Sequence, residues 1–216
     1  MRKAIIFDMD GTLLNTLEDL YLGTNAALSQ YGFPERTLEE VRQFVGNGAR
    51  NLMIRAVPGG GDNPHLEDCL QAFQKHYGQH MNDHTGPYEG IPELLEKLSG
   101  EGFSMAIVSN KPDFAVRELA EKFFGDVIGV AIGESEGVHR KPAPDMVALA
   151  AEKLGVALCD CIYVGDSEVD LQTANNCKIP CVSVTWGFRG REYLLSLGAR
   201  HTAGDTQELY EILVSL

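Results

Sequence analysis

Two aspartates, Asp8 and Asp10, stand one residue apart in the stretch AIIFDMDGTLL near the start of the chain. The apolar residues 5–7 favour a β-strand and Gly11 favours a turn, so both carboxylates should lie where a strand meets a loop. Like charges at this spacing repel each other. The pair could cap a surface turn through its side-chain oxygens, or it could belong to a site that also holds a cation.

Three further stretches place polar or charged side chains at, or just after, the ends of predicted strands. They are residues 108–111 (VSNK), 140–145 (RKPAPD) and 165–170 (GDSEVD). Each alone has an ordinary explanation, because Ser109 could cap a helix and Lys141 could be solvated. Ligands of parallel sheets bind outside the carboxyl ends of the strands, so the joint placement favours a shared site.

This group of residues would suit phosphoryl chemistry. Four carboxylates gathered near one lysine carry more negative charge than a fold can hold at low cost. The carboxylates are those of Asp8, Asp10, Asp166 and Asp170, and the lysine is Lys141. A hard divalent cation removes the excess, and donors that are all oxygen suit Mg²⁺. The cation and Lys141 would screen a phosphoryl group while the Ser109 hydroxyl donates to its oxygens. One aspartate can then attack phosphorus while the other carries a proton for the leaving oxygen.

Two patterns of secondary structure divide the chain. After the first strand, helical patterns cover residues 17–31, 38–44, 49–57 and 65–81. From residue 86 onward, strands expected at 104–109, 127–132, 161–165 and 181–185 alternate with helices expected at 92–101, 113–123, 144–154, 168–176 and 206–214. This alternation predicts an α/β fold with a mostly parallel sheet, helices on both of its faces and an inserted helical unit.

The motifs DMDGTLL, VSN, RKPAPD and GDSEVD, in this order along the chain, resemble those of the haloacid dehalogenase superfamily of phosphohydrolases. The resemblance implies a Rossmann-like parallel core with a small, mobile helical cap between the first and second motifs. We therefore expect residues 1–15 and 84–216 to form the core domain and residues 16–83 the cap domain. Residues 15–16 and 84–87 are the expected hinges.

The resemblance also implies catalytic roles. Asp8 would be the nucleophile that forms an aspartyl-phosphate. Asp10 would be the general acid that protonates the leaving group and then activates water. Ser109 and Lys141 would hold the phosphoryl oxygens.

A Mg²⁺ cofactor is implied in the same way. Its expected ligands are Asp8, the backbone carbonyl of Asp10, and Asp166, while Asp170 would support the metal through water or by orienting Lys141. In addition, Thr12 and Asn110 are expected to bind the substrate.

Residues 44–56, 87–98 and 185–189 are similar to phosphoglycolate phosphatases, which makes 2-phosphoglycolate the expected substrate. If the turn that contains Asn47 faces the active site, Arg50 could form a two-pronged contact with the substrate carboxylate. A solvated helix arginine is an equally good interpretation. Pyrophosphatases and β-phosphoglucomutases share the same cap type, so a pyrophosphatase or a sugar phosphomutase is an alternative.

A signalling receiver module is the main non-enzyme alternative, since it also gathers carboxylates, Mg²⁺, a hydroxyl group and a lysine around a phosphorylated aspartate. A receiver carries that aspartate on a later strand and has no cap. Here the paired aspartates close the first strand and a helical insert follows, which favours the enzyme.

Composition limits the partners. A formal net charge of −13 and a pI near 4.8 disfavour nucleic acid, whereas a small phosphorylated metabolite is compatible with a local positive site. No apolar stretch approaches the ~20 residues of a membrane span. Five cysteines without a Cys-x-x-Cys pair, and no secretory signal, lead us to expect a cytoplasmic protein, as a monomer or a homodimer.

Overall fold

The computed structural model describes residues 4–216, which divide into two compact units. One unit contains the chain up to Leu14 together with Pro87–Leu216, and the other is Asn15–Gly86. Strands β2 (Leu14–Asn15) and β3 (Gly86–Pro87) pair with each other where the chain passes between the units.

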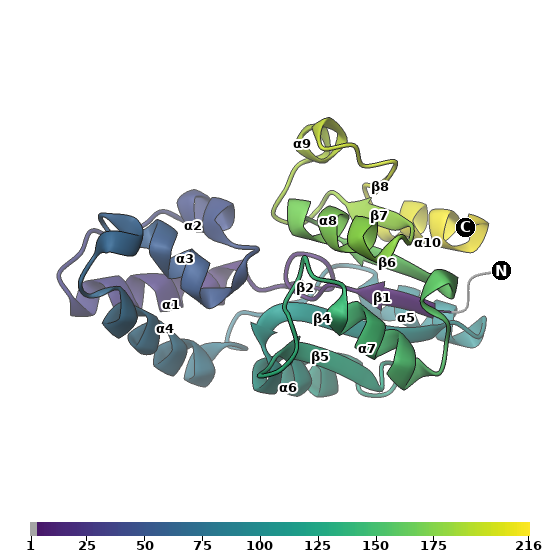
Figure 1. Ribbon diagram of the computed structural model, residues 1–216, viewed down its shortest axis with the longest axis horizontal. Helices are drawn as coiled ribbons and strands as arrows, with labels where there is room; N and C mark the ends of the chain where they lie inside the picture. The colour runs from purple at the N-terminus through teal and green to yellow at the C-terminus, as the bar shows by residue number, and fades with distance from the viewer. Residues whose placement is uncertain (1–3) are drawn as a thin grey trace. The chain divides into compact units, whose positions relative to one another are not determined.

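The larger unit is built on a six-stranded parallel sheet in the order β5-β4-β1-β6-β7-β8 (Figure 1). The strands are β1 (Ala4–Phe7), β4 (Ser104–Pro112), β5 (Val130–Glu134), β6 (Cys161–Gly165), β7 (Cys181–Val184) and β8 (His201–Ala203). Strand β1 lies between β4 and β6, and its four apolar residues are fully buried, as expected for a strand covered on both faces.

Helices cover both faces of this sheet because successive strand residues point to opposite sides. Ile5 and Phe7 share one core with α5, α6 and α10, whereas Ala4 and Ile6 share the other with α7 and α8. The covering helices are α5 (Ile91–Gly100), α6 (Asp113–Phe124), α7 (Asp145–Leu154), α8 (Glu168–Cys177) and α10 (Thr206–Ser215). The α/β fold class predicted from the sequence is confirmed.

The smaller unit is helical and consists of α1 (Leu17–Gln30), α2 (Leu38–Phe44), α3 (Gly48–Ala56), the short 3₁₀ helix η1 (Gly60–Asp62) and α4 (Leu66–His80). Helices α1 and α4 approach closely at Gly23, where an added Cβ would lie 3.3 Å from the Phe73 ring. The buried Asp19 carboxylate accepts hydrogen bonds from the backbone N–H groups of His84 and Thr85 and from the Thr85 hydroxyl. These bonds hold the last segment of the unit against its first helix.

The elements of the larger unit that the sequence analysis missed include α9 (Arg191–Ser196), β8 and the short 3₁₀ helix η2 (Leu158–Asp160). Strand β8 has only three residues between Gly198 and Gly204, too few for an alternating pattern to be recognised. Strand β4 also runs three residues beyond its expected end at Ser109. Among residues 4–216, no helix is long and apolar enough to cross a membrane.

Candidate active site

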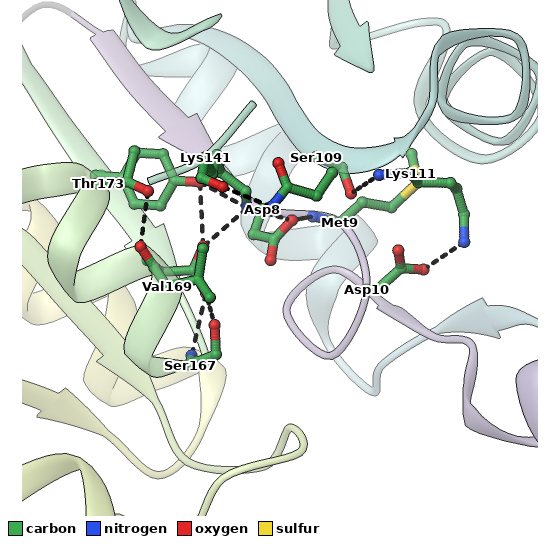
Figure 2. Close-up of polar contacts among 12 residues, drawn as sticks. Asp8, Met9, Asp10, Ser109, Lys111, Lys141, Ser167, Val169 and Thr173 are labelled. Atoms are coloured by element: carbon green, nitrogen blue, oxygen red, sulfur yellow. Dashed lines mark hydrogen bonds and ion pairs between the residues drawn. The ribbon is translucent and has the colours of Figure 1, made fainter. Parts of the chain in front are cut away.

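The candidate site lies at the carboxyl ends of the central strands, where Asp8 follows β1 directly (Figure 2). The backbone N–H of Asp8 donates to the Val164 carbonyl of β6 at 2.8 Å, so sheet pairing fixes the backbone at this aspartate. Ser109 and Lys111 come from the end of β4, and Lys141 comes from the segment before α7. The strand ends thus bring together groups far apart in the sequence.

A buried ammonium group ties two of the carboxylates together. The Nζ atom of Lys141 lies 2.9 Å from an oxygen of Asp8 and 2.9 Å from an oxygen of Asp170, and its side chain is 2% exposed. The Tyr163 hydroxyl accepts from Lys141 at 3.0 Å and donates to Asp170 at 3.2 Å. Burial lowers the pKa of Lys141, but the charges of Asp170 and Asp8 outweigh it and raise the pKa well above its usual value. The lysine therefore stays charged.

Asp8 is held in an environment that opposes its ionisation. Burial, followed by the charge of Asp170, raises the pKa of Asp8 from 3.8 to about 7, although Lys141 acts in the opposite direction. Its Oδ1 atom accepts from the Met9 backbone N–H at 2.7 Å as well as from Lys141. A further positive charge beside this carboxylate would lower its pKa again and favour its ionised form at neutral pH.

Asp166 occupies a closely packed position at the end of β6. Its Oδ2 atom accepts from the Phe188 N–H at 2.6 Å, and a Cβ atom added to Gly11 or Gly187 would overlap that oxygen. Burial, with the charges of Asp170 and Asp8, raises the pKa of Asp166 well above its usual value. Glycine at both positions leaves room for the carboxylate.

Asp170 is engaged on both of its oxygens. Oδ1 accepts from Lys141 and Tyr163, and Oδ2 accepts from the Ser167 backbone N–H at 3.1 Å and hydroxyl at 2.6 Å. These hydrogen bonds connect the start of α8 to Lys141, so Asp170 is well placed to orient the Lys141 ammonium group.

The buried carboxylates fit a hard divalent cation. One oxygen each from Asp8, Asp166 and Asp170 lies within 4.8 Å of the others. The donors are all oxygen, which matches Mg²⁺, and a cation there would reverse the raised pKa values of Asp8 and Asp166. The Asp10 carboxylate is not among the three residues of this group.

Asp10 pairs with a second lysine instead. Its Oδ1 atom lies 2.8 Å from Nζ of Lys111, and the lysine side chain is 4% exposed. The sequence analysis quoted Lys111 within the VSNK stretch but gave it no role. A lysine two residues after a candidate phosphate-binding serine, at the same strand end, was the available signal.

The predicted substrate-binding residues of the larger unit carry unpaired polar atoms. Among residues 4–216, the buried Thr12 hydroxyl and the buried Asn110 side-chain carbonyl are without hydrogen-bond partners. The Asn110 amide donates to the Lys141 carbonyl at 2.9 Å, and the Ser109 hydroxyl accepts from the Lys111 N–H at 3.3 Å. Unpaired buried polar atoms are costly, so Thr12 and Asn110 are available to a ligand.

Arg50 and Asn47 belong to the smaller unit. Arg50 forms an exposed ion pair with Glu67, and the Asn47 backbone carbonyl accepts from the Asn51 amide at 2.9 Å. Their contact with a substrate stays a prediction.

Comparison with known proteins places these residues in a family context. The sequence model of the haloacid dehalogenase-like hydrolases matches residues 5–184. A phosphoglycolate phosphatase of Thiobacillus denitrificans is 34% identical over 88% of this chain and 86% of its own length. Another, from Xanthomonas campestris, is 32% identical over 87% of this chain and 85% of its own. A crystal structure from Lactobacillus delbrueckii subsp. bulgaricus, provisionally assigned the same activity, superposes with a TM-score of 0.95 at 36% identity and covers 99% of both chains.

Proposed function

Because the chain belongs to the haloacid dehalogenase-like hydrolase family and is a phosphatase, we propose that it hydrolyses 2-phosphoglycolate with Mg²⁺ through an aspartyl-phosphate. One observation supports the chemistry most directly. The Asp8 carboxylate lies 2.9 Å from the ammonium of Lys141 and belongs to the group of three carboxylates, while Asp10 stands two residues further along the chain. The names of the relatives support the substrate.

The metal site would use Asp8 and Asp166, with the backbone carbonyl of Asp10 as a further ligand. Bound Mg²⁺ would offset the charge of the phosphoryl oxygens and favour the ionised form of Asp8. Asp170, whose oxygens are both hydrogen-bonded within the protein, would orient Lys141.

In the first step, an Asp8 oxygen attacks phosphorus. Two donors hold Oδ1, so Oδ2 is the attacking atom. Lys141 and the Ser109 hydroxyl hold the phosphoryl oxygens as the bond from phosphorus to the ester oxygen breaks. Asp10 gives its proton to that oxygen, and the alcohol leaves.

In the second step, the ionised Asp10 takes a proton from a water molecule. The water oxygen attacks phosphorus, the bond to Asp8 breaks, and inorganic phosphate forms. Asp8 returns as a carboxylate and Asp10 as the acid, so each turnover consumes one ester and one water.

The helical unit Asn15–Gly86 is proposed to act as the cap, with Arg50 and Asn47 contacting the substrate carboxylate. Arg50 would then exchange its exposed partner Glu67 for the substrate. A guanidinium group suits this role because it binds a carboxylate through two parallel hydrogen bonds. The cytoplasmic location and the monomeric or dimeric state stay predictions.

The test is phosphate release, with and without Mg²⁺, from 2-phosphoglycolate, glucose 1-phosphate, pyrophosphate and an aryl phosphate. We expect the highest kcat/KM for 2-phosphoglycolate, no activity without the metal, and none in Asp8→Asn. A dominant rate with pyrophosphate, or phosphate transfer to a sugar instead of water, would replace the proposed substrate with one of the alternatives. Undiminished activity of Asp8→Asn would remove the proposed nucleophile.

A further inference from the structure

Strand β4 is irregular at its carboxyl end. In its pairing with β5, Val108 faces Ile132 and Pro112 faces Glu134. Three residues of β4, the last of which is Lys111, therefore lie opposite a single residue of β5. Such a bulge bends a strand and changes the direction of its side chains, and bulges are frequent beside active sites.

The two lysines of the site lie on opposite sides of Asp8 (Figure 2). Lys141 contacts Asp8 and Asp170, whereas Lys111 contacts Asp10 at 2.8 Å. Both lysine side chains are almost completely buried, at 2% and 4% exposure. A buried lysine has a strong requirement for anionic partners.

The positions of the lysines suggest a division of roles. Lys141 contacts Asp8, the residue that attacks phosphorus in the proposed mechanism, so it belongs to the phosphoryl side of the reaction. Asp10 must face the leaving oxygen if it is to protonate it, so Lys111 belongs to the leaving-group side. With Asp10 placed at the leaving oxygen, an ammonium hydrogen-bonded to Asp10 would lie within reach of a carboxylate that is attached to that oxygen through one carbon atom.

We propose that Lys111 determines specificity for the leaving group, binding a carboxylate one carbon away from the ester oxygen while it remains beside Asp10. The site would then favour phosphate monoesters of 2-hydroxy acids over esters of uncharged alcohols. This inference rests on the proposed function, because it requires Asp10 to act on the leaving oxygen. It adds a residue of the α/β unit to the recognition of the carboxylate, beside the Arg50 and Asn47 proposed above.

The experiment compares 2-phosphoglycolate with ethyl phosphate, whose leaving group has the same two carbons but no carboxylate. The variants are Lys111→Met, Lys111→Gln and Lys111→Arg, with folding checked by circular dichroism. Losing one charge-assisted hydrogen bond should lower kcat/KM for 2-phosphoglycolate about 10- to 100-fold more than for ethyl phosphate in the Met and Gln variants. Lys111→Arg should keep most of the wild-type preference.

The outcomes separate this inference from the proposed function. A wild type with no preference for 2-phosphoglycolate would refute the proposed substrate and this inference together. A wild-type preference that survives in Lys111→Met or Lys111→Gln would leave the proposed substrate intact and overturn the role of Lys111. Lys111→Gln keeps a donor for Asp10 without the charge, so the inference does not depend on the Met variant being folded.

Discussion

Each of the two units buries a carboxylate, and the two solve the problem of buried charge in different ways. In the helical unit, Asp19 is 2% exposed and accepts two backbone N–H groups and one hydroxyl from the segment at His84 and Thr85. In the α/β unit, Asp8 accepts one backbone N–H and pairs with a lysine that it shares with Asp170. Asp19 is satisfied by neutral donors, whereas Asp8 remains in a group with excess negative charge.

The difference separates a structural carboxylate from a functional one. Hydrogen bonds from Thr85 and His84 fix Asp19 and connect two segments of its own unit, so no further ligand is needed. In the group at the sheet edge, three carboxylates (Asp8, Asp166 and Asp170) face one ammonium group, that of Lys141, which leaves two negative charges for a divalent cation to offset. A buried carboxylate therefore indicates a functional site here only where the hydrogen-bond donors and cations of the protein do not themselves compensate its negative charge.

The largest expected effect comes from Lys141→Met. This change leaves Asp8 and Asp170 buried without their shared cation, so the free energy of unfolding of the metal-free protein should fall by about 3–5 kcal/mol. The exposed Lys153, changed in the same way, should stay within about 0.5 kcal/mol of wild type. Urea denaturation in EDTA measures both. Equal stability of the two variants would show that Lys141 is not needed to balance the buried charges.

A smaller effect is expected from Gly187→Ala. The added methyl group would overlap the Gly11 carbonyl and an Asp166 oxygen, and overpacking of this kind costs about 1–3 kcal/mol. Because Asp166 must move, Mg²⁺ affinity should fall as well, as titration calorimetry can measure. Gly190→Ala is the matched control, since an added Cβ there meets no atom within 4 Å. Unchanged metal affinity in Gly187→Ala would argue against Asp166 as a ligand.

The pH dependence of stability tests the imbalance of charge directly. A carboxyl whose pKa is about 7 in the folded protein and 3.8 in the unfolded chain binds more protons when folded, so rising pH destabilises the fold across that interval. In EDTA, the stability of Asp8→Asn relative to wild type should therefore grow from about pH 4 to about pH 7 and level off above it.

Mg²⁺ should remove most of this difference by stabilising wild type, as thermal melting at several pH values would show. Asp19→Asn serves as the contrast, because its loss of stability should not respond to Mg²⁺. A Mg²⁺ response that is the same in Asp8→Asn as in wild type would contradict the comparison between the two carboxylates.

The sequence predicted secondary structure well where local residue patterns decide it, such as a run of apolar residues that favours a strand. The apolar run before Asp8 predicted a strand, which the structure shows buried between β4 and β6, and the bounds of β6 and α2 were predicted correctly. Sequence reasoning failed for Lys111, because a lysine at a strand end is by default solvated, and the bulge that directs it depends on pairing with β5. Contacts set by the register between strands have no local pattern in the sequence.

The smallest effect on the fold is expected at Arg50, which lies in the helical unit and outside any buried network. Its side chain is 47% exposed and that of its partner Glu67 is 62% exposed, so Arg50→Ala should change the free energy of unfolding by no more than about 1 kcal/mol.

If Arg50 binds the substrate carboxylate, the Arg50→Ala variant should raise KM for 2-phosphoglycolate several-fold more than for ethyl phosphate. Glu67→Gln, which removes the competing partner, should not raise it. Equal increases for both esters would restrict Arg50 to its surface ion pair, and recognition of the carboxylate would then fall to the α/β unit, where Lys111 is the candidate.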